Sequence, residues 1–472
     1  MIDKTQTHKQ YYDILIIGSG PAGYVCALRA AQLGFEVALI ERGKLGGVCL
    51  NTGCIPTKSL LKNAEIANML KEDGSILGFS FDHLKLDYTK AVKRSRENSS
   101  KLEEGLKALF KRNHVTVIEG EGTILGPGKV VVTDTSTCRR SFFSNHIVIA
   151  TGASAIMPEH WKVDNDVLTY SEAIIQKTLP KSIVIVGSGA IGLEFGSIWN
   201  AYGTKVTIIE MADRIAPLED EEISSSLEKE LHNRGIETLT GYAVKSIERI
   251  EKNLRVHSEC AGTSITVDAE QVLVAIGFKP NTENLGLESL GLESMIGSAI
   301  KTDDHMATSI PGVWAIGDVT AKMMLAHVGF AQGTLCAEEI GEVESNLIDY
   351  HAVPHAIYSI PQVASFGYTE QQARAIFKQI KVGKARFRAN GKAVGNGEEN
   401  GWVKLVFTGA RNKLIGAHLI GYDVSELLPE LTLAKTLEAT MEDISLNIHA
   451  HPTLSEILRE AALSASGSPL HG

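Results

Sequence analysis

Short apolar runs that end in glycine turns recur up to about residue 350. The runs 13–17 and 182–186 are each followed by a glycine-rich turn, a helical segment and a second apolar run, at 37–40 and 205–209. A run of about four to eight apolar residues bounded by turns is typical of a buried parallel strand. The pattern therefore predicts two βαβ units, each the start of a Rossmann-like, doubly wound α/β domain.

Weaker signals predict the rest of these two domains. Between about residues 60 and 110 the chain reads as two long helices rich in Lys and Glu, with polar faces toward solvent. Further strands are predicted at 115–118, 120–122, 130–132, 147–150, 272–276 and 313–316.

The pattern changes from about Tyr350. Strand-like segments separated by Gly- and Asn-rich turns indicate an antiparallel sheet, and a helix is predicted from about Val424 to Thr440. The strand-like segments lie at 362–367, 381–387, 402–407 and 414–420. The fold class is therefore α/β with two dinucleotide-binding domains and a C-terminal α+β domain. The predicted boundaries are 1–153 (first domain), 154–280 (second domain), 281–349 (return to the first domain) and 350–472 (C-terminal domain).

Composition narrows the class of protein. At 472 residues the chain is long enough for about three domains. A net charge of −10 argues against nucleic acid as a partner, and six cysteines do not make a disulfide scaffold. No apolar run reaches the roughly 18 residues of a membrane span, and the polar residues 1–10 lack the apolar core of a signal peptide. We expect a cytoplasmic protein, or a matrix protein whose presequence has been removed.

The first βαβ unit carries a dinucleotide fingerprint. Its glycines allow a tight turn and the close approach of a pyrophosphate to a helix N-terminus, and its acid accepts hydrogen bonds from ribose hydroxyls. The residues are Gly18, Gly20, Gly23 and Glu41.

The second unit repeats the fingerprint. In both copies the acid follows the last glycine by 18 positions, 23 to 41 and 192 to 210. Equal spacing in two copies makes a chance match improbable. A carboxylate at this place accepts from a ribose 2′-hydroxyl and repels a 2′-phosphate, and the first arginine after it is Arg214, so NAD is favoured over NADP. The residues are Gly187, Gly189, Gly192 and Glu210.

Two cysteines, Cys49 and Cys54, lie in a glycine-containing stretch that precedes a helical pattern. A helix N-terminus lowers a thiol pKa, so a redox-active pair is the first hypothesis. The alternatives are two structural thiols or half of a zinc site. A zinc site normally needs a second Cys or His pair, which the sequence does not offer at matching spacing, so we expect no metal.

The run 46–58, GGVCLNTGCIPTK, resembles the signature of the FAD-dependent pyridine nucleotide–disulfide oxidoreductases, with Val48 where Thr is commoner. The resemblance extends over essentially the whole chain. It implies that the first fingerprint binds FAD, that the second binds NAD, and that the C-terminal domain forms the interface of a homodimer.

The resemblance also implies roles for the residues around the flavin. Cys54 would lie beside the flavin and Cys49 would meet the substrate. Lys58 would lie near flavin N5 and pair with Glu194. The alternatives are a solvated helix lysine for Lys58 and an ordinary first-turn glutamate for Glu194.

Other nucleotide contacts are implied by the same resemblance. Asp318 would bind the ribityl hydroxyls of FAD, or would serve as a turn or capping acid. The further FAD contacts are Gly122, Thr151, Gly152, Met324, Leu325, Ala326 and His327, and the further NAD contacts are Val244 and Gly277. Phe278 stands where the family often has an arginine, which alters the local loop and puts no chemistry in doubt.

The ending 449–456, HAHPTLSE, is similar to the family's terminal motif. It implies that His451 is the base for the substrate thiol and that Glu456 orients its ring, both supplied from the other subunit. His449 is left as packing or as a residue behind the site.

Three features favour, within the family, an NAD-dependent enzyme that oxidises dihydrolipoamide. They are the acid Glu210, the intact cysteine pair, and the lack of a second cysteine pair at the C-terminus. The lipoyl group would arrive on the acyltransferase of a 2-oxoacid dehydrogenase complex, because only about a dozen residues precede the first strand. Two alternatives remain: a family enzyme for another disulfide, a quinone or a metal ion, and a flavoprotein that is a structural or regulatory subunit.

Overall fold

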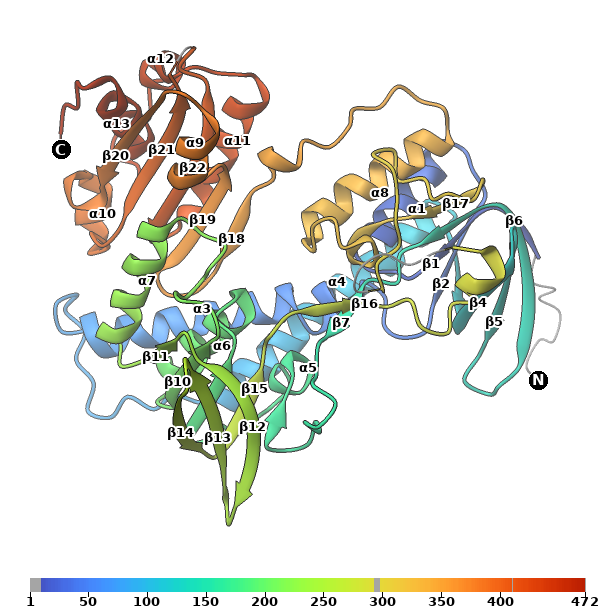
Figure 1. Ribbon diagram of the computed structural model, residues 1–472, viewed down its shortest axis with the longest axis horizontal. Coiled ribbons are helices and arrows are strands. Elements are labelled where there is room, and N and C mark those ends of the chain that lie inside the picture. The colour runs from blue at the N-terminus through green and yellow to red at the C-terminus, as the bar shows by residue number, and fades with distance from the viewer. Residues whose placement is uncertain (1–9, 293–297, 410, 472) are drawn as a thin grey trace. The chain divides into compact units, whose positions relative to one another are not determined.

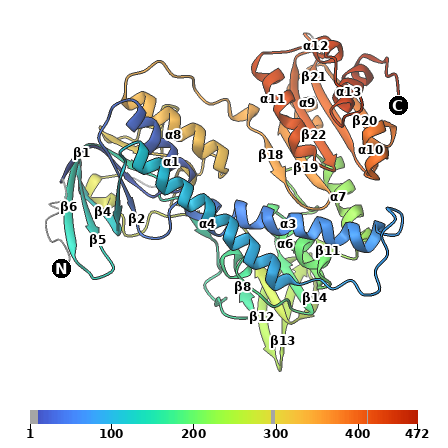
Figure 2. The same ribbon diagram turned by 180° about the vertical axis from the view of Figure 1, so that it is seen from behind.

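The computed structural model describes residues 10–292, 298–409 and 411–471, so most of the polar N-terminal segment lies outside it. The chain forms two compact units, which are described separately (Figures 1 and 2). The first unit comprises Met1–Ser59, Val92–Ile156 and Gly277–Ile348, and the second comprises Leu60–Ala91, Met157–Ile276 and Asp349–Gly472.

The first unit is built on a mixed sheet with the order β3-β2-β1-β6-β5-β4, in which β17 also pairs with β6. β1, β2, β3, β17 and the end of β6 are parallel, whereas β4, β5 and the start of β6 are antiparallel. The strands are β1 (Tyr11–Ile17), β2 (Val37–Glu41), β3 (Thr116–Glu119), β4 (Glu121–Gly126), β5 (Lys129–Thr133), β6 (Arg139–Ile149) and β17 (Val313–Ala315).

Alternate residues of β1 and β2 pack into different cores on the two faces of this sheet. Ile14 and Ile16 join the core under helices α1 and α8, while Leu15 and Ile17 join the core under the β4–β5 hairpin. Figures 1 and 2 both show α1 beside α8. The helical segments are α1 (Pro21–Gln32), α2 (Gly47–Asn51), the 3₁₀ turns η2 (Leu287–Leu290) and η4 (Gly317–Thr320), and α8 (Ala326–Ile340), with the short strands β7 (Ala153–Ala155) and β16 (Phe278–Pro280) paired antiparallel.

Two long helices contain residues of both units. They are α3 (Cys54–Asn68), which continues into the π-helical turn η1 (Met69–Asp73), and α4 (Tyr88–Arg112). The prediction of two long helices between residues 60 and 110 is confirmed. The cysteines lie as expected, because Cys49 is inside the short helix α2 and Cys54 begins α3.

The second unit repeats the parallel sheet, with the order β11-β10-β9-β15-β8. Its central strands are as buried as the continuous apolar runs predict. The elements are β8 (Val167–Leu168), α5 (Tyr170–Ala173), β9 (Ser182–Val186), α6 (Ala190–Ala201), β10 (Lys205–Glu210), α7 (Glu221–Asn233), β11 (Glu237–Thr240) and β15 (Gln271–Val274).

An antiparallel sheet between β11 and β15 was not predicted. Its strands are β12 (Ala243–Ile250), β13 (Asn253–Cys260) and β14 (Thr263–Ala269). Leu254 and Val256 pack against the parallel sheet, while polar residues fill most of the other positions. One apolar face on short polar strands is a weak periodic signal, so the sequence pattern alone did not separate these strands from a loop.

The C-terminal part of the second unit is an antiparallel sheet with the order β18-β19-β22-β21-β20, which confirms the predicted α+β character. Its strands are β18 (His355–Ile357), β19 (Gln362–Gly367), β20 (Ile380–Arg386), β21 (Trp402–Thr408) and β22 (Leu414–Gly421). Its helical segments are η5 (Tyr350–Ala352), α9 (Glu370–Ile376), η6 (Phe387–Ala389), α10 (Gly391–Asn396), η7 (Val424–Leu427), α11 (Leu428–Thr436), α12 (Met441–Leu446) and α13 (Glu456–Ser466).

The predicted helix from Val424 to Thr440 is wrong at both ends. Its first turn is the 3₁₀ segment η7, and α11 starts only at Leu428, where Pro429 occupies the first turn. Glu438 has a φ of +55° and stops the helix. Thr440 cannot belong to α11, because its hydroxyl caps α12 in a capping box with Asp443.

Among the described residues, no helix combines the length and the apolar composition that a membrane-spanning segment requires.

Candidate active site

The first fingerprint forms a tight turn between β1 and α1. Gly18 has a φ of +105°, and a Cβ there would lie 2.3 Å from the Ala150 carbonyl oxygen. A Cβ on Gly23 would lie 1.9 Å from the Gly18 oxygen, so helix and strand pack too closely for any side chain. Gly20 is the N-cap of α1, and a Cβ there would meet nothing within 4 Å. Open space therefore faces the helix N-terminus, where a pyrophosphate fits.

The second fingerprint reproduces this geometry in the other unit. Gly187 has a φ of +102°, and its Cβ would lie 2.4 Å from the Ala275 oxygen. A Cβ on Gly192 would lie 2.1 Å from the Gly187 oxygen, and one on Gly189, the N-cap of α6, would meet nothing within 4 Å. The residues at both turns therefore fit a dinucleotide in the same way.

The two fingerprint acids are held identically. Ser19 donates to Glu41 Oε2 from its amide (2.9 Å) and its hydroxyl (2.6 Å), and Ser188 does so to Glu210 Oε2 (2.8 and 2.7 Å). The other oxygen accepts from an amide two residues on, at Gly43 (2.7 Å) or Ala212 (2.8 Å). Each carboxylate is therefore fixed, and its remaining lone pairs are available to ribose hydroxyls.

The two cysteines of the predicted redox pair lie together in the first unit. Cys49 and Cys54 are at a distance compatible with a disulfide, and both are thiols in this structure. A hydrogen bond to Cys54 and burial raise the pKa of the Cys49 thiol far above its usual range, while the nearby positive charge of Lys58 lowers it. The hydrogen bond between the two cysteines is therefore the main influence on the ionisation of Cys49.

Polar contacts fix the backbone around the cysteines. The Asn51 side chain donates to the carbonyl oxygens of Leu45 (2.9 Å) and Gly47 (3.0 Å). Arg96, on α4, donates from Nη1 to the backbone carbonyl oxygen of Asn51 at 2.6 Å. Thr57 donates to the Gly53 oxygen at 2.7 Å, which closes the first turn of α3.

Asp318 lies in η4 at the end of β17. Burial raises the pKa of its carboxyl to about 6. Among the described residues its carboxylate has no hydrogen-bond or ion-pair partner, which fits a group that binds the hydroxyls of a ligand. Of the four predicted contacts at 324–327, Met324 lies before α8, Leu325 is its N-cap, and Ala326 and His327 are its first residues.

The remaining predicted FAD contacts lie near the strand ends. Gly122 is in β4, where a Cβ would lie 3.3 Å from side chains of Ile17 and Ile40. Thr151 Oγ1 donates to the Asn281 oxygen at 2.7 Å, and Gly152, with a φ of +69°, accepts from the Asn281 amide.

The predicted NAD and flavin contacts are divided between the units. Glu194 is buried in α6 in the second unit, where Oε1 accepts from the Tyr358 amide at 3.1 Å, whereas Lys58 belongs to the first unit. Val244 lies at a β-bulge of β12, and Gly277 belongs to the first unit, where its oxygen accepts from the Ile156 amide. A Lys58–Glu194 pair therefore stays a prediction.

The terminal motif brings His451 and Glu456 together. His451 Nδ1 lies 2.9 Å from Glu456 Oε1, and Glu456 Oε2 accepts from the Thr453 amide at 2.9 Å. The hydrogen bond from that amide lowers the pKa of Glu456 most, and the His451 ring lowers it further, against the opposing effect of burial. The carboxylate therefore stays charged and fixes the ring, which leaves Nε2 exposed for a proton.

His449 is held differently. Its Nε2 lies 2.9 Å from Glu430 Oε1, and its side chain is 5% exposed, compared with 76% for His451. The His449 ring is therefore buried against Glu430, whereas the His451 ring is exposed.

Comparisons with known proteins give the family. Residues 12–333 match the family described as pyridine nucleotide-disulphide oxidoreductase, and residues 353–462 match its dimerisation domain. The chain belongs to the pyridine nucleotide–disulphide oxidoreductase family. Its enzymes use FAD and NAD(H), and this chain is a flavoprotein disulphide oxidoreductase with their two nucleotide-binding folds and C-terminal dimerisation domain.

Curated relatives match over nearly the full chain. The dihydrolipoyl dehydrogenase of Corynebacterium glutamicum is 41% identical over 97% of this chain and 98% of its own. That of Mycobacterium leprae is 43% identical (95% and 97%), and that of Geobacillus stearothermophilus is 38% identical (97% of both).

Two solved structures share the fold of this family. The crystal structure of LpdA from Mycobacterium tuberculosis superposes with a TM-score of 0.89 at 25% identity, over 95% of this chain and 99% of that one. The HOCl-induced flavoprotein disulfide reductase RclA from Escherichia coli gives 0.85 at 27% identity, over 96% and 99%.

The dimerisation domain carries apolar side chains that the single chain leaves uncovered. Leu437, Leu446 and Ile448, on and after α11 and α12, are 70%, 78% and 93% exposed. Exposed apolar side chains of this size mark an association surface when they are grouped.

Sequence reasoning missed several residues at the site. Ser19 and Ser188 fix the two acids, and their matching places in the two fingerprints were the available signal. Tyr24 was also missed; burial and the charges of Cys49 and Cys54 raise its pKa, so its hydroxyl lies near the thiols. Arg96 gave no signal, because its helix is rich in exposed charged residues.

Proposed function

We propose that this flavoenzyme oxidises dihydrolipoamide to lipoamide with NAD⁺ as the acceptor. The observation that carries the proposal is the identity of 38–43% with dihydrolipoyl dehydrogenases over nearly the whole length of both chains. The hydrogen-bonded Cys49–Cys54 pair and the carboxylate of Glu210 support a dithiol substrate and a nucleotide without a 2′-phosphate.

The thiol chemistry begins from the oxidised, disulfide form of the pair. One substrate thiolate attacks Cys49 Sγ, which breaks the Cys49–Cys54 bond and releases Cys54 as a thiolate. The second substrate thiol then attacks the mixed disulfide, so that lipoamide leaves with a new S–S bond and Cys49 leaves as a thiol. The substrate has lost two electrons, and the cysteine pair has gained them.

The proton of the attacking thiol passes to His451 Nε2 of the partner subunit. The Glu456 carboxylate holds the Nδ1–H tautomer that leaves Nε2 able to accept it. A FAD held beside Cys54 would accept the electron pair of the reduced cysteines and would supply it as hydride to NAD⁺. Lys58, whose charge acts on Cys49, would supply positive charge to a bound flavin, and its pairing with Glu194 stays a prediction from the sequence.

The first fingerprint, with Gly122, Thr151, Gly152, Asp318 and the start of α8, holds FAD in this proposal. The second fingerprint, with Val244 and Gly277, holds NAD. Exposed apolar residues of the dimerisation domain support a homodimer. Its macromolecular partner is the lipoyl-bearing acyltransferase of a 2-oxoacid dehydrogenase complex, and a cytoplasmic location stays a prediction from the sequence.

Replacement of the interchange thiol tests the proposal. We expect Cys49→Ser to retain FAD and to lose turnover of dihydrolipoamide with NAD⁺. Cys138→Ser is the matched control, because Cys138 is an exposed cysteine of the same unit, outside the fingerprints and the cysteine stretch. Full dihydrolipoamide turnover in Cys49→Ser would exclude the disulfide mechanism. If a different dithiol reduces the flavin of the wild-type protein and dihydrolipoamide does not, that dithiol and not dihydrolipoamide is the substrate.

A further inference from the structure

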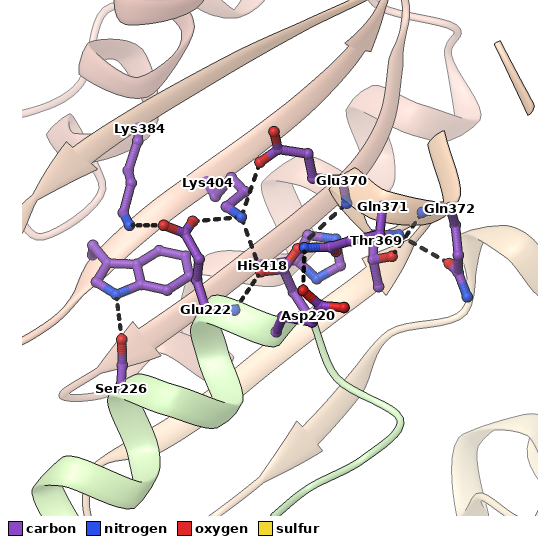
Figure 3. A network of polar contacts seen from close by, with 12 residues as sticks. Asp220, Glu222, Ser226, Thr369, Glu370, Gln371, Gln372, Lys384, Lys404 and His418 are labelled. Carbon is purple, nitrogen blue, oxygen red and sulfur yellow. Dashed lines mark hydrogen bonds and ion pairs between the residues drawn. The ribbon is translucent and has the colours of Figure 1, made fainter. Parts of the chain in front are cut away.

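A lysine is buried where the dimerisation domain meets the nucleotide-binding part of the second unit. Lys404, in the middle of β21, is 1% exposed. Its Nζ lies 2.9 Å from Asp220 Oδ1, 2.5 Å from Glu222 Oε2 and 3.1 Å from Glu370 Oε2 (Figure 3). Burial opposes its charge, but hydrogen bonds to these carboxylates raise its pKa above the usual value, so Lys404 is a cation at working pH.

The contacts of Lys404 fix the start of α7. Asp220 is the N-cap of this helix, and its Oδ1 accepts from the Glu222 amide (3.0 Å) as well as from Lys404. Its Oδ2 accepts from the Glu370 amide at 3.3 Å. Glu222 is held from its other side by Lys384 at 3.1 Å (Figure 3). The N-terminus of α7 is therefore attached to β20, β21 and α9 at several points.

Residues 211–219, here called the ribose loop, lie between the fingerprint acid Glu210 and the N-cap Asp220. One end of the loop belongs to the fingerprint: Ala212 donates to Glu210 Oε1 (2.8 Å), and the Ala216 amide donates to Ser188 Oγ (3.2 Å). The other end also reaches the C-terminal sheet, because Ser365 donates to Glu219 Oε2 at 2.7 Å. The loop is short and is fixed at both ends.

The first unit provides a contrast within the same chain. There Gly46 donates to Ser19 Oγ at 3.2 Å, as Ala216 does to Ser188, but the loop after Glu41 leads into the cysteine helix α2. In the second unit the same position leads to α7 and to the Lys404 network. The attachment to the dimerisation domain is therefore specific to the second fingerprint.

We propose that Lys404 is a positioning residue for NAD(H), because its ion pairs with Asp220 and Glu222 hold the ribose loop against the dimerisation sheet. The proposal rests on the assignment of NAD(H) to the second fingerprint. A loop released at Asp220 no longer keeps the Ala212 and Ala216 amides on Glu210 and Ser188, so the ribose end of the nucleotide binds more weakly. The cysteines and the first fingerprint lie outside this network.

The test is anaerobic equilibrium titration of NADH into the FAD-loaded protein after full reduction with dithionite, so that NADH binds without transferring hydride. Lys404→Met with Asp220→Asn removes both buried charges together and keeps an N-cap acceptor, because Asn caps a helix as well as Asp does. We expect the dissociation constant for NADH to rise about tenfold. Flavin reduction by excess dihydrolipoamide should keep the wild-type rate. The matched control is Lys413→Met with Glu438→Gln, which removes a 2.7 Å ion pair of the same C-terminal domain that does not touch α7.

Lys384→Met provides a second variant, since it leaves the buried charges in place and removes the 3.1 Å contact with Glu222. We expect it to raise the NADH dissociation constant about two- to threefold, and it decides the question if the double variant does not fold. The proposal is overturned if the folded double variant binds NADH with an affinity within twofold of the wild type. If only Lys384→Met folds, the same result in that variant overturns it. A wild-type protein that binds NADH but fails to oxidise dihydrolipoamide would refute the proposed function and leave this titration decisive for Lys404.

Discussion

The first two glycines of the second fingerprint should respond in opposite ways to substitution by alanine. In Gly187→Ala the new Cβ lies 2.4 Å from the Ala275 carbonyl oxygen, at a φ of +102° that L-residues avoid. Backbone strain of about 1–3 kcal/mol and overpacking of about 1–3 kcal/mol together predict a loss of roughly 2–6 kcal/mol in folding free energy. In Gly189→Ala the backbone is extended and the Cβ meets no protein atom within 4 Å. That variant should lose only about 0.5–1 kcal/mol as a poorer N-cap.

Binding should show the reverse pattern. The alanine methyl group at position 189 occupies the space through which a pyrophosphate oxygen approaches the amides at the start of α6. Loss of one hydrogen bond to a charged group, about 1.5–3 kcal/mol, corresponds to a rise of roughly 10- to 150-fold in the dissociation constant for NADH. Thermal unfolding followed by circular dichroism measures the loss of stability. Anaerobic titration of NADH into the fully reduced flavoprotein, followed by nicotinamide fluorescence, measures the dissociation constant. A stable Gly189→Ala protein with wild-type NADH affinity would refute the assignment of this turn to the pyrophosphate.

Three further outcomes are expected. Glu456→Gln should fold normally and lower kcat for dihydrolipoamide about 10- to 100-fold, because the His451 ring loses the carboxylate that fixes its tautomer; steady-state rates that match the wild type would contradict this role. The stability advantage of Asp318→Asn apoprotein over the wild type should grow as the pH rises from 4 to 7. The pKa of Asp318 in the folded wild type is about 6, above the usual 3.8, so the folded state binds a proton more tightly than the unfolded state and loses up to roughly 3 kcal/mol of folding free energy through this range. A difference in melting temperature between the two proteins that is the same at pH 4 and pH 7 would count against this. Cys54→Ala should speed alkylation of Cys49 by iodoacetamide at pH 8, because the hydrogen bond that raises the Cys49 pKa is gone, and an unchanged rate would show that Cys54 does not control it.

The repeated fingerprint was readable from the sequence because its chemistry is local. A turn that excludes any Cβ requires glycine at Gly18 and Gly187, and the acid follows one strand later at a distance set by one helix. The cysteine stretch was readable for the same reason, since Cys49 and Cys54 are five positions apart and meet through one short helix. Continuous apolar runs also marked β9 and β10 correctly, because both faces of these strands are buried.

Features that depend on distant partners were not readable. The strands β12–β14 have only one apolar face, and the sequence does not state which core receives it. Lys404 follows Trp402 and Val403 in an apolar strand, which signals a buried charge, but its carboxylates come from positions 220, 222 and 370. The end of α11 depends on Thr440, whose hydroxyl serves the next helix. In each case tertiary contacts override the local pattern.

The most direct test of the proposed activity is anaerobic mixing of the purified flavoprotein with dihydrolipoamide, followed by NAD⁺ or NADP⁺, with the flavin spectrum recorded. The proposed function predicts rapid reduction with a long-wavelength absorption band from the Cys54 thiolate beside the flavin, and reoxidation by NAD⁺ but not by NADP⁺. A flavin that stays oxidised in dihydrolipoamide yet is reduced by NADH would preserve both nucleotide sites and contradict dihydrolipoamide as the substrate.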